Sequence, residues 1–200
     1  MTYSIIGTGA VGSALARQFA RRGIAVGIAN TRPPGTLAAT AKAHGDTVAP
    51  LTLQEALQAD VVILAMPFHA HTGIAATLAN WTGKVVVDAM NTYGIPEADL
   101  AGRPSTEVVA SAFTGAKVVK TFNQLPAPLL AQDPDVHGGR RVMFVSSNDA
   151  GAEASMAALV AELGFAPILL GRVDEGGRLI VFGGTGTGGP LVLQDLVRHG

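Results

Sequence analysis

Three glycines near the start of the chain have the spacing of a turn that binds phosphate. Residues 4–15 read SIIGTGAVGSAL, with Gly7, Gly9 and Gly12 in the pattern G-x-G-x-x-G. Gly7 permits a tight turn out of a strand, and Gly9 lets the backbone approach a pyrophosphate. Gly12 lets the following helix pack closely on that strand. The pattern predicts a dinucleotide site, and the alternative is a purely structural turn.

The context of these glycines favours the dinucleotide site. An apolar run precedes them, an alanine-rich run follows, and a second apolar run comes after that, as a strand, a helix and a strand would. The start of the helix offers unpaired N–H groups and a partial positive charge to phosphate oxygens. The predicted cofactor contacts in this turn are Gly7, Thr8, Gly9, Ala10, Val11 and Gly12.

The end of the second predicted strand indicates which dinucleotide the chain prefers. A site for NAD places an acidic residue about 20 residues after the turn, where it binds the ribose hydroxyls. Residues 28–34 read IANTRPP and contain no carboxylate. Asn30, Thr31 and Arg32 instead supply donors for a 2′-phosphate, and a guanidinium binds phosphate through two hydrogen bonds. The segment predicts NADP (as NADPH), unless Arg32 is only a solvated loop charge.

Residues at three later strand ends are candidates for the nicotinamide end of the site. Ligands of this fold bind at the carboxyl edge of the sheet. Met66, Pro67 and Phe68 follow the fourth predicted strand and are expected to form a wall against the nicotinamide ribose and ring. Asn91 and Asn123 end the next two strands. Either could bond the nicotinamide amide or an acceptor ring, although asparagines at strand ends also form local turns.

The remaining candidates are two histidines and an arginine. His69 and His71 stand two apart, so on an extended segment they would face one side, as metal ligands can; no third ligand is evident, and we expect no metal. Hydride transfer from a nicotinamide needs no nucleophile. The catalytic candidates are therefore Asn123 and His69, the latter as a proton donor or else as a solvated loop side chain. Arg178 is a candidate for contact with an acidic part of the acceptor.

Short apolar runs alternate with alanine-rich stretches along the whole chain. This alternation predicts an α/β fold of the Rossmann type, doubly wound, with a mostly parallel sheet. The expected strands are 3–6, 24–29, 47–49, 61–65, 85–88, 118–121, 142–146 and 167–170. The expected helices are 11–22, 37–44, 53–58, 72–80, 106–112 and 150–163. Asn148 is expected to cap the last of these.

The end of the chain has a different composition. Residues 171–189 are rich in glycine, and Pro190 is expected to open a short terminal helix over residues 190–198. We expect residues 1–200 to form a single NADP-binding domain, with residues 170–200 as an extension that contributes to an acceptor pocket and a dimer contact. Two hundred residues leave no room for a second full-sized domain beside it.

Composition excludes several classes of function. The formal net charge is −1 and only 14% of residues are charged, so the chain has no electrostatic footprint for nucleic acid or an acidic membrane. It contains no cysteine, which removes disulfides and thiolate catalysis. No apolar run approaches the roughly 18–20 residues that span a bilayer. We expect a cytoplasmic protein whose partners are small molecules, with no nucleic acid and no membrane.

Several short segments resemble, in the same order, those of the coenzyme F420:NADP oxidoreductase family. They are IGTG at 6–9, NTR at 30–32, AMPF at 65–68, VDAMN at 87–91, VKTFN at 119–123 and GGPL at 188–191. The resemblance covers nearly the whole chain. It implies hydride transfer between NADPH and coenzyme F420 or another flavin-like acceptor. It also implies a homodimer, and an acceptor pocket beside the nicotinamide formed partly by the C-terminal segment.

The chain departs from this family near the acceptor. His69 and His71 stand where the family tends to carry an acidic residue and a histidine in another register, and Asn123 stands where a histidine is sometimes found. Two alternatives therefore stay open. One is an NADPH-dependent reductase of a small carbonyl or imine. The other is a non-catalytic NADP(H)-binding module that regulates a partner.

Overall fold

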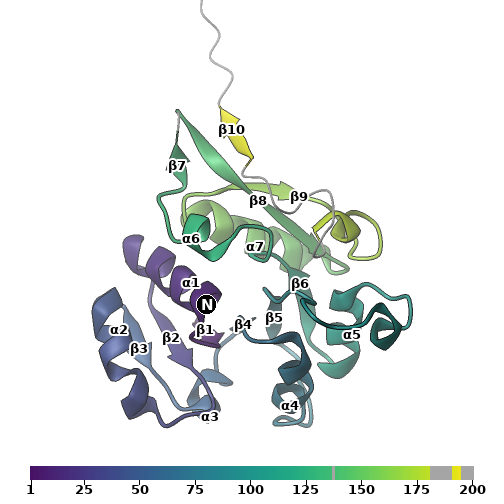
Figure 1. Cartoon of the computed structure of the whole chain (residues 1–200), viewed down its shortest axis with the longest axis horizontal. Coiled ribbons are helices and arrows are strands. Elements are labelled where there is room, and N and C mark those ends of the chain that lie inside the picture. Colours follow the sequence, from purple (N-terminus) through teal and green to yellow (C-terminus); the bar gives the residue numbers. More distant parts are fainter. Residues whose placement is uncertain (137, 181–190, 195–200) are drawn as a thin grey trace, which may run out of the picture.

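The computed structural model describes residues 1–136, 138–180 and 191–194 (Figure 1). Its strands are β1 (Tyr3–Ile6), β2 (Val26–Ala29), β3 (Val48–Pro50), β4 (Val61–Leu64), β5 (Val85–Asp88), β6 (Lys117–Lys120), β7 (Asp135–Val136), β8 (Gly139–Ser147), β9 (Ala166–Leu169) and β10 (Val192–Gln194). Its α-helices are α1 (Ala10–Arg21), α2 (Ala38–His44), α3 (Leu53–Ala56), α4 (His71–Ala75), α5 (Ser105–Ala112), α6 (Ala127–Leu130) and α7 (Ala150–Glu162). Short 3-10 turns cover Pro34–Leu37, Phe68–Ala70, Glu97–Leu100 and Gly176–Ile180.

Six strands form the parallel sheet that the sequence predicts. They lie in the order β3-β2-β1-β4-β5-β6, and each neighbouring pair is parallel. The chain runs outward from β1 to β3, then returns to the middle and runs outward again from β4 to β6 (Figure 1). The predicted α/β, Rossmann-type fold is confirmed. In such a fold a ligand crevice lies at this reversal, outside the carboxyl ends of β1 and β4.

Apolar side chains cover both faces of this sheet. β4 and β5 are buried at every position, as expected of strands covered on both sides. One face carries a cluster that includes Phe19 of α1 and Met156 of α7. On the other face Trp81 packs edge-on against Phe113, with ring centroids 4.6 Å apart, and its Nε1–H donates to the Ala75 carbonyl. These clusters hold the strand ends that carry the site.

A second group of strands extends the sheet beyond β6. β8 runs antiparallel to β6 and pairs with it at two positions, and β7, β9 and β10 pair with β8. Further along β8, the side chain of Gln124 hydrogen-bonds to the backbone of β8 as a neighbouring strand would. Its Nε2–H donates to the Val142 carbonyl at 3.3 Å, and its Oε1 accepts from the Phe144 N–H at 3.1 Å. One buried amide therefore joins the two groups of strands.

The terminal helix expected over residues 190–198 is wrong. Val192–Gln194 form β10, antiparallel to β8, and the Val142 N–H donates to the Leu191 carbonyl at 2.8 Å. A sheet edge offers a row of unpaired backbone groups, and pairing with them stabilises an extended segment more than a short isolated helix can. Residues 181–190 and 195–200, which include the rest of this prediction and part of the glycine-rich segment, lie outside the described residues.

The cap expected for α7 is also different. The helix begins at Ala150 as predicted, but the side chain of Asp149, not Asn148, accepts the Ala152 N–H, at 2.8 Å. The side chain of Asn148 instead accepts the Val173 N–H at 3.1 Å and ties down the segment after β9. Sequence spacing alone could not separate two adjacent residues that both cap helices well.

The end of one helix and the whole of another short helix were not predictable from the alanine pattern. The helix expected over residues 72–80 ends at Ala75, and the Thr77 hydroxyl donates to the Ile74 carbonyl, which competes with the helical ladder. The short helix α6 was not predicted, because the prolines at its start are typical of a loop. Within the described residues, no helix is long and apolar enough to cross a membrane.

Gln124→Ala should lower the free energy of unfolding by about 2–4 kcal/mol, because it leaves a buried carbonyl and a partly buried N–H of β8 without their partner. Urea unfolding followed by circular dichroism measures the change. Gln58→Ala, at an exposed position after α3, is the matched control and should change little. Equal effects of the two substitutions would show that the Gln124 amide does not join the strands.

Candidate functional site

The glycine turn after β1 is shaped by two close contacts and one open space. Gly7 has φ +109°, in the left-handed region that favours glycine. A Cβ at Gly7 would collide with the Ala65 carbonyl, and a Cβ at Gly12 would collide with the Gly7 carbonyl. A Cβ at Gly9 would meet no atom of the described residues within 4 Å. Packing therefore requires Gly7 and Gly12, whereas Gly9 faces open space.

The start of α1 faces the same open space. Gly9 is the N-cap of the helix, no side chain caps it, and its first turn holds no acidic residue. The Ser13 N–H donates to the Gly9 carbonyl at 2.9 Å, so the N–H groups of residues 10–12 have no acceptor within the helix. These groups and the helix dipole favour an anion here. The arrangement fits a pyrophosphate.

The loop after β2 is tied to this turn by one side chain. Asn30 donates through Nδ2 to the Thr8 hydroxyl at 3.0 Å and accepts the Arg32 N–H on Oδ1 at 2.8 Å. Thr31 and Arg32 are exposed, and no ion pair among the described residues involves Arg32. Asn30 thus orients the loop while the Arg32 guanidinium stays available to an anion.

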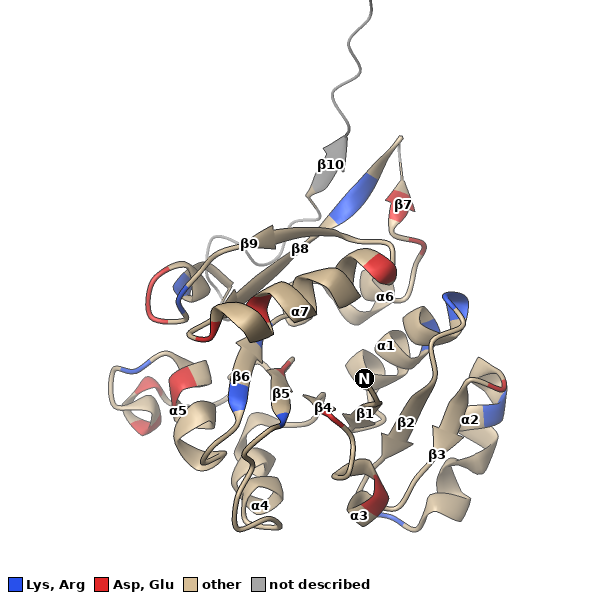
Figure 2. Ribbon diagram, turned by 180° about the vertical axis from the view of Figure 1, so that it is seen from behind, with Lys and Arg blue, Asp and Glu red and all other residues tan. Residues whose placement is uncertain are grey.

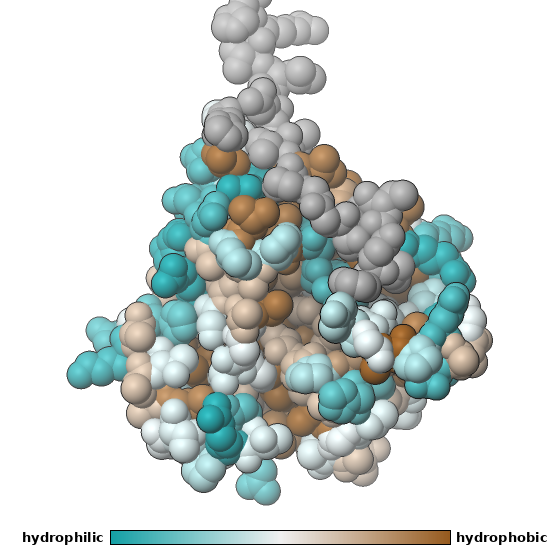
Figure 3. Space-filling model, viewed as in Figure 1, coloured by the Kyte–Doolittle hydropathy of each residue, from teal (hydrophilic) through white to brown (hydrophobic). Residues whose placement is uncertain are grey.

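A cavity of about 540 Å³ joins these loops to the end of β4. It lies outside the carboxyl ends of β1, β2 and β4, where the fold places ligands. On the face seen in Figure 3, residues of intermediate hydropathy lie in the middle and hydrophilic ones lie mostly toward the edges. The lining residues are Ile6, Gly7, Thr8, Gly9, Asn30, Thr31, Leu53, Ala65, Met66, Pro67, Ala70, Gly73 and Ile74.

The three residues expected to form a wall after β4 do not lie together. Met66 and Pro67 line the cavity. Phe68 is only 6% exposed and belongs to the apolar cluster beneath it, where its ring lies 4.8 Å from that of His71. The structure therefore brings two of these residues to the cavity, while the third supports the turn from below.

The two histidines of this turn have different environments. The segment is helical rather than extended, so His69 is exposed while His71 is buried. A ring nitrogen of His71, Nδ1, lies 2.5 Å from the Phe68 carbonyl, and its Nε2 has no partner among the described residues. Among all the residues that the structure describes, no group of three His, Cys, Asp or Glu side chains could hold a metal ion.

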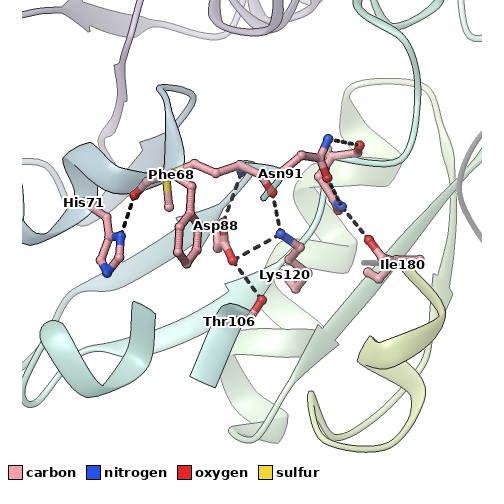
Figure 4. A network of polar contacts seen from close by, with 9 residues as sticks. Phe68, His71, Asp88, Asn91, Thr106, Lys120 and Ile180 are labelled. Carbon is pink, nitrogen blue, oxygen red and sulfur yellow. Dashed lines mark hydrogen bonds and ion pairs between the residues drawn. The ribbon is translucent and has the colours of Figure 1, made fainter. Parts of the chain in front are cut away.

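Asn91 and Asn123, which follow β5 and β6, form a reciprocal pair (Figure 4). Asn91 donates through Nδ2 to the Asn123 carbonyl, and Asn123 donates through Nδ2 to the Asn91 Oδ1, both at 3.0 Å. Asn123 also donates to the Ile180 carbonyl of the turn after β9. The pair joins two strand ends to a segment about sixty residues further along the chain.

Two features of this pair point to a ligand. Asn123 is 5% exposed, and its Oδ1 has no hydrogen-bond partner among the described residues. The preceding Phe122 is fully buried with φ +66°, which is unusual for a bulky residue and costs on the order of 1–2 kcal/mol. Strained backbone and unpaired buried polar atoms gather at binding sites. The arrangement offers a hydrogen-bond acceptor to an amide or ring N–H.

A buried ion pair lies below the asparagines (Figure 4). The Nζ of Lys120 lies 3.1 Å from the Asp88 Oδ2 and donates to the Met90 carbonyl at 2.6 Å. The other Asp88 oxygen accepts the Met90 N–H at 3.0 Å, and the Thr106 hydroxyl donates to Oδ2 at 2.8 Å. The side chains of Lys120 and Asp88 are 2% and 0% exposed. The pair fixes the backbone immediately before Asn91.

Sequence reasoning did not assign a role to this ion pair. Its signal was present, because Asp88 and Lys120 each end an apolar run of a strand predicted to be buried. Charged residues are almost never fully buried unless they are paired. Two opposite charges at the ends of neighbouring buried strands could therefore have been matched.

The sheet order and the glycine turn define a Rossmann-type protein. Residues 2–92 match the family described as NADP oxidoreductase, coenzyme F420-dependent. A solved structure from Arthrobacter sp. FB24, assigned as an F420-dependent NADP-reductase, is 30% identical; the match covers 86% of each chain with a TM-score of 0.72. The chain belongs to this family of NADP-dependent oxidoreductases.

Two other solved structures resemble the chain. A hypothetical protein from Sinorhizobium meliloti is 44% identical, and the match covers 97% of this chain and 96% of that one with a TM-score of 0.92. A reductive aminase from Aspergillus terreus, in complex with NADPH and ethyl-5-oxohexanoate, is 22% identical with a TM-score of 0.64. That match covers 88% of this chain and 56% of the aminase, and shows the fold alone. None of the curated proteins matches the chain.

Lys120→Met should lower the free energy of unfolding by about 3–5 kcal/mol, because it leaves the Asp88 carboxylate buried without its counter-charge. Adding Asp88→Asn should restore part of the loss. Urea unfolding measures both, with Lys117→Met, at a half-exposed position of the same strand, as the control with little effect. If the two lysine variants lose equal stability, the buried pair is not what holds these strand ends.

Proposed function

We propose that the chain is an enzyme that transfers a hydride between NADPH and coenzyme F420 or another flavin-like acceptor. The observation that carries this proposal is the buried Oδ1 of Asn123, which has no hydrogen-bond partner among the described residues and lies at the same sheet edge as the glycine turn, residues 7–12. A dinucleotide whose pyrophosphate is bound by the glycine turn would need a polar partner for its nicotinamide ring at the other end of the site. Membership of the F420-dependent family supports both the cofactor and the class of acceptor.

The residues of the sheet edge fit the parts of NADPH in order. The N–H groups at the start of α1 suit the pyrophosphate, because they are donors without acceptors in the helix. The space beside Gly9 is open for it, and a side chain at Gly9 would fill that space. The exposed Arg32 suits the 2′-phosphate. The cavity bounded by Thr31, Met66 and Pro67 has room for the adenosine. We therefore retain the predicted cofactor contacts, with Phe68 supporting the turn and not lining the cavity.

Bound NADPH supplies the hydride, and the chain has to orient it and keep water away. The Oδ1 of Asn123 can accept a hydrogen bond from the nicotinamide carboxamide or from the ring of the hydride acceptor. Asn91 holds the side-chain amide of Asn123 in place. Met90 and Phe122 are buried and supply apolar cover. Direct transfer between two rings requires close stacking and no nucleophile. His69, exposed after β4, remains the candidate proton donor.

The assembly and the extent of the domain are further parts of the proposal. We infer a homodimer in which residues 170–200 complete an acceptor pocket, on a single domain of residues 1–200. The contact of Ile180 with Asn123 supports the placement of the acceptor pocket, because it brings the start of that extension to the strand ends. The competing functions are reduction of a small carbonyl or imine, and NADP(H) binding without catalysis.

Arg32→Ala should remove most of the preference for NADPH. We expect the unmodified protein to bind NADPH at least about tenfold more tightly than NADH, because one charge-assisted contact contributes roughly 1.5–3 kcal/mol. Isothermal titration calorimetry with both dinucleotides measures the ratio. Arg17→Ala, an exposed arginine further along α1, is the control and should leave the ratio unchanged. Equal affinity of the unmodified protein for NADPH and NADH would refute the NADP assignment.

The acceptor is tested by the decay of NADPH absorbance with coenzyme F420, FMN, riboflavin, and a ketone with an amine. We expect turnover with F420 or a flavin and none with the ketone. Gly9→Val should abolish it, because the side chain would occupy the space for the pyrophosphate, while circular dichroism stays unchanged because the backbone there has φ −74°. Turnover of only the ketone would establish the imine-type function, and binding without any turnover would indicate a regulatory module.

A further inference from the structure

A second cavity, of about 470 Å³, lies between the start of α5 and the 3-10 turn Gly176–Ile180. Figure 2 shows this turn next to α5, on the side of the sheet away from α2 and β3. It is separate from the cavity over the glycine turn, with which it shares no lining residue. Its polar lining includes Thr92, Glu97, Arg103, Ser105 and Arg178.

Two guanidinium groups face this cavity from segments far apart in the sequence. Arg103 donates through one nitrogen to the Ser111 hydroxyl at 3.2 Å, and Arg178 donates through Nε to the Asp174 carbonyl at 2.8 Å. Each guanidinium carries five N–H donors, so most of them remain available. Neither arginine forms an ion pair within the part of the chain that the structure describes.

The nearby carboxylates do not neutralise both arginines. Glu175 and Asp174 are the acids nearest to Arg178 along the chain; neither lines the cavity, and the Asp174 carboxylate pairs with Arg172 at 3.0 Å. That contact is the main reason why the pKa of Asp174 lies below its usual value, with Arg178 a smaller contributor. Glu97 is the one acidic residue of the lining. Two arginines against one glutamate leave the cavity with a positive balance.

Ser105 adds a hydroxyl to the lining of this cavity. The residue is only 5% exposed, and it lines the cavity beside the two arginines. Ser105 also opens α5, whose N-cap, Pro104, offers no side-chain cap. The surroundings of Ser105, guanidinium groups and a helix start, favour a negatively charged group.

The cavity adjoins the proposed hydride site. Thr92 follows Asn91 directly, and Arg178 stands two residues before Ile180, whose carbonyl accepts from Asn123. The neighbour of Ser105, Thr106, bonds Asp88 of the buried ion pair. A molecule with its ring at the asparagines could therefore extend a substituent into the cavity.

We propose that this cavity binds an anionic group, a phosphate or carboxylate, carried by the hydride acceptor. Arg103 and Arg178 would contact the anion through paired N–H groups, and Ser105 would donate its hydroxyl proton. The proposal rests on the proposed function for the position of the acceptor ring. It adds the expectation that acidic acceptors are selected over neutral ones with the same ring.

FMN and riboflavin test this directly, because they share one ring system and differ by a phosphate. We expect a KM for FMN at least about tenfold below that for riboflavin at low salt, with similar kcat. Arg178→Ala and Arg103→Ala should raise the FMN value toward that of riboflavin and leave the riboflavin value unchanged. Arg140→Ala, exposed on β8, is the control and should alter neither value. Equal KM values in the unmodified protein, or variants that weaken both flavins alike, would overturn the proposal.

A second measurement separates this proposal from the proposed function. If neither flavin is reduced, hydride transfer to flavins fails, but the cavity can still be examined by quenching of flavin fluorescence in the NADP⁺-bound protein. Tighter binding of FMN than of riboflavin, lost in the two arginine variants, would support the anion site. Binding that does not distinguish the flavins, or no binding of either, would remove it.

Discussion

The buried pair of Asp88 and Lys120 is the constraint on which the candidate site depends. It joins the ends of β5 and β6, and it holds both the carbonyl and the N–H of Met90. Burying two charges costs several kcal/mol per ion, which is offset only when both find good partners. The pair has such partners in the Met90 backbone and the Thr106 hydroxyl. The position of Asn91 is therefore defined by electrostatics below the site and not by the exposed loop above it.

A different constraint acts at the other end of the sheet edge. There the backbone of the turn, the Ala65 carbonyl and the start of α1 approach so closely that only hydrogen fits at Gly7 and Gly12. Steric contacts thus determine the conformation of the glycine turn, whereas an ion pair and hydrogen bonds determine the positions of Asn91 and Asn123. Substitutions at the two ends should accordingly be distinguishable, since one set alters backbone packing and the other leaves a charge without its partner.

The glycine turn and the six parallel strands were predictable because each depends on neighbours in sequence: spacing of glycines, and apolar runs long enough for a strand. The role of Gln124 was not, because it depends on which strands become neighbours. The charges of Asp88 and Lys120 could be matched only by placing their two buried strands side by side. The strand at Val192–Gln194 was missed for the same reason, since its partner lies about fifty residues earlier. Of the site, the spacing of residue types identified the candidates. It did not show that Phe68 is buried, or that the Asn123 Oδ1 has no partner among the residues that the structure describes.

The backbone of Phe122 has a consequence for how the protein recognises its ligands. Its conformation is not one that an isolated chain would choose, yet its ring is completely enclosed by the core. The packing of the core around this ring therefore maintains the backbone geometry. The entropy of ordering the segment is lost during folding and not during binding. The site at this sheet edge should then be preorganised, with small structural differences between the free and bound forms.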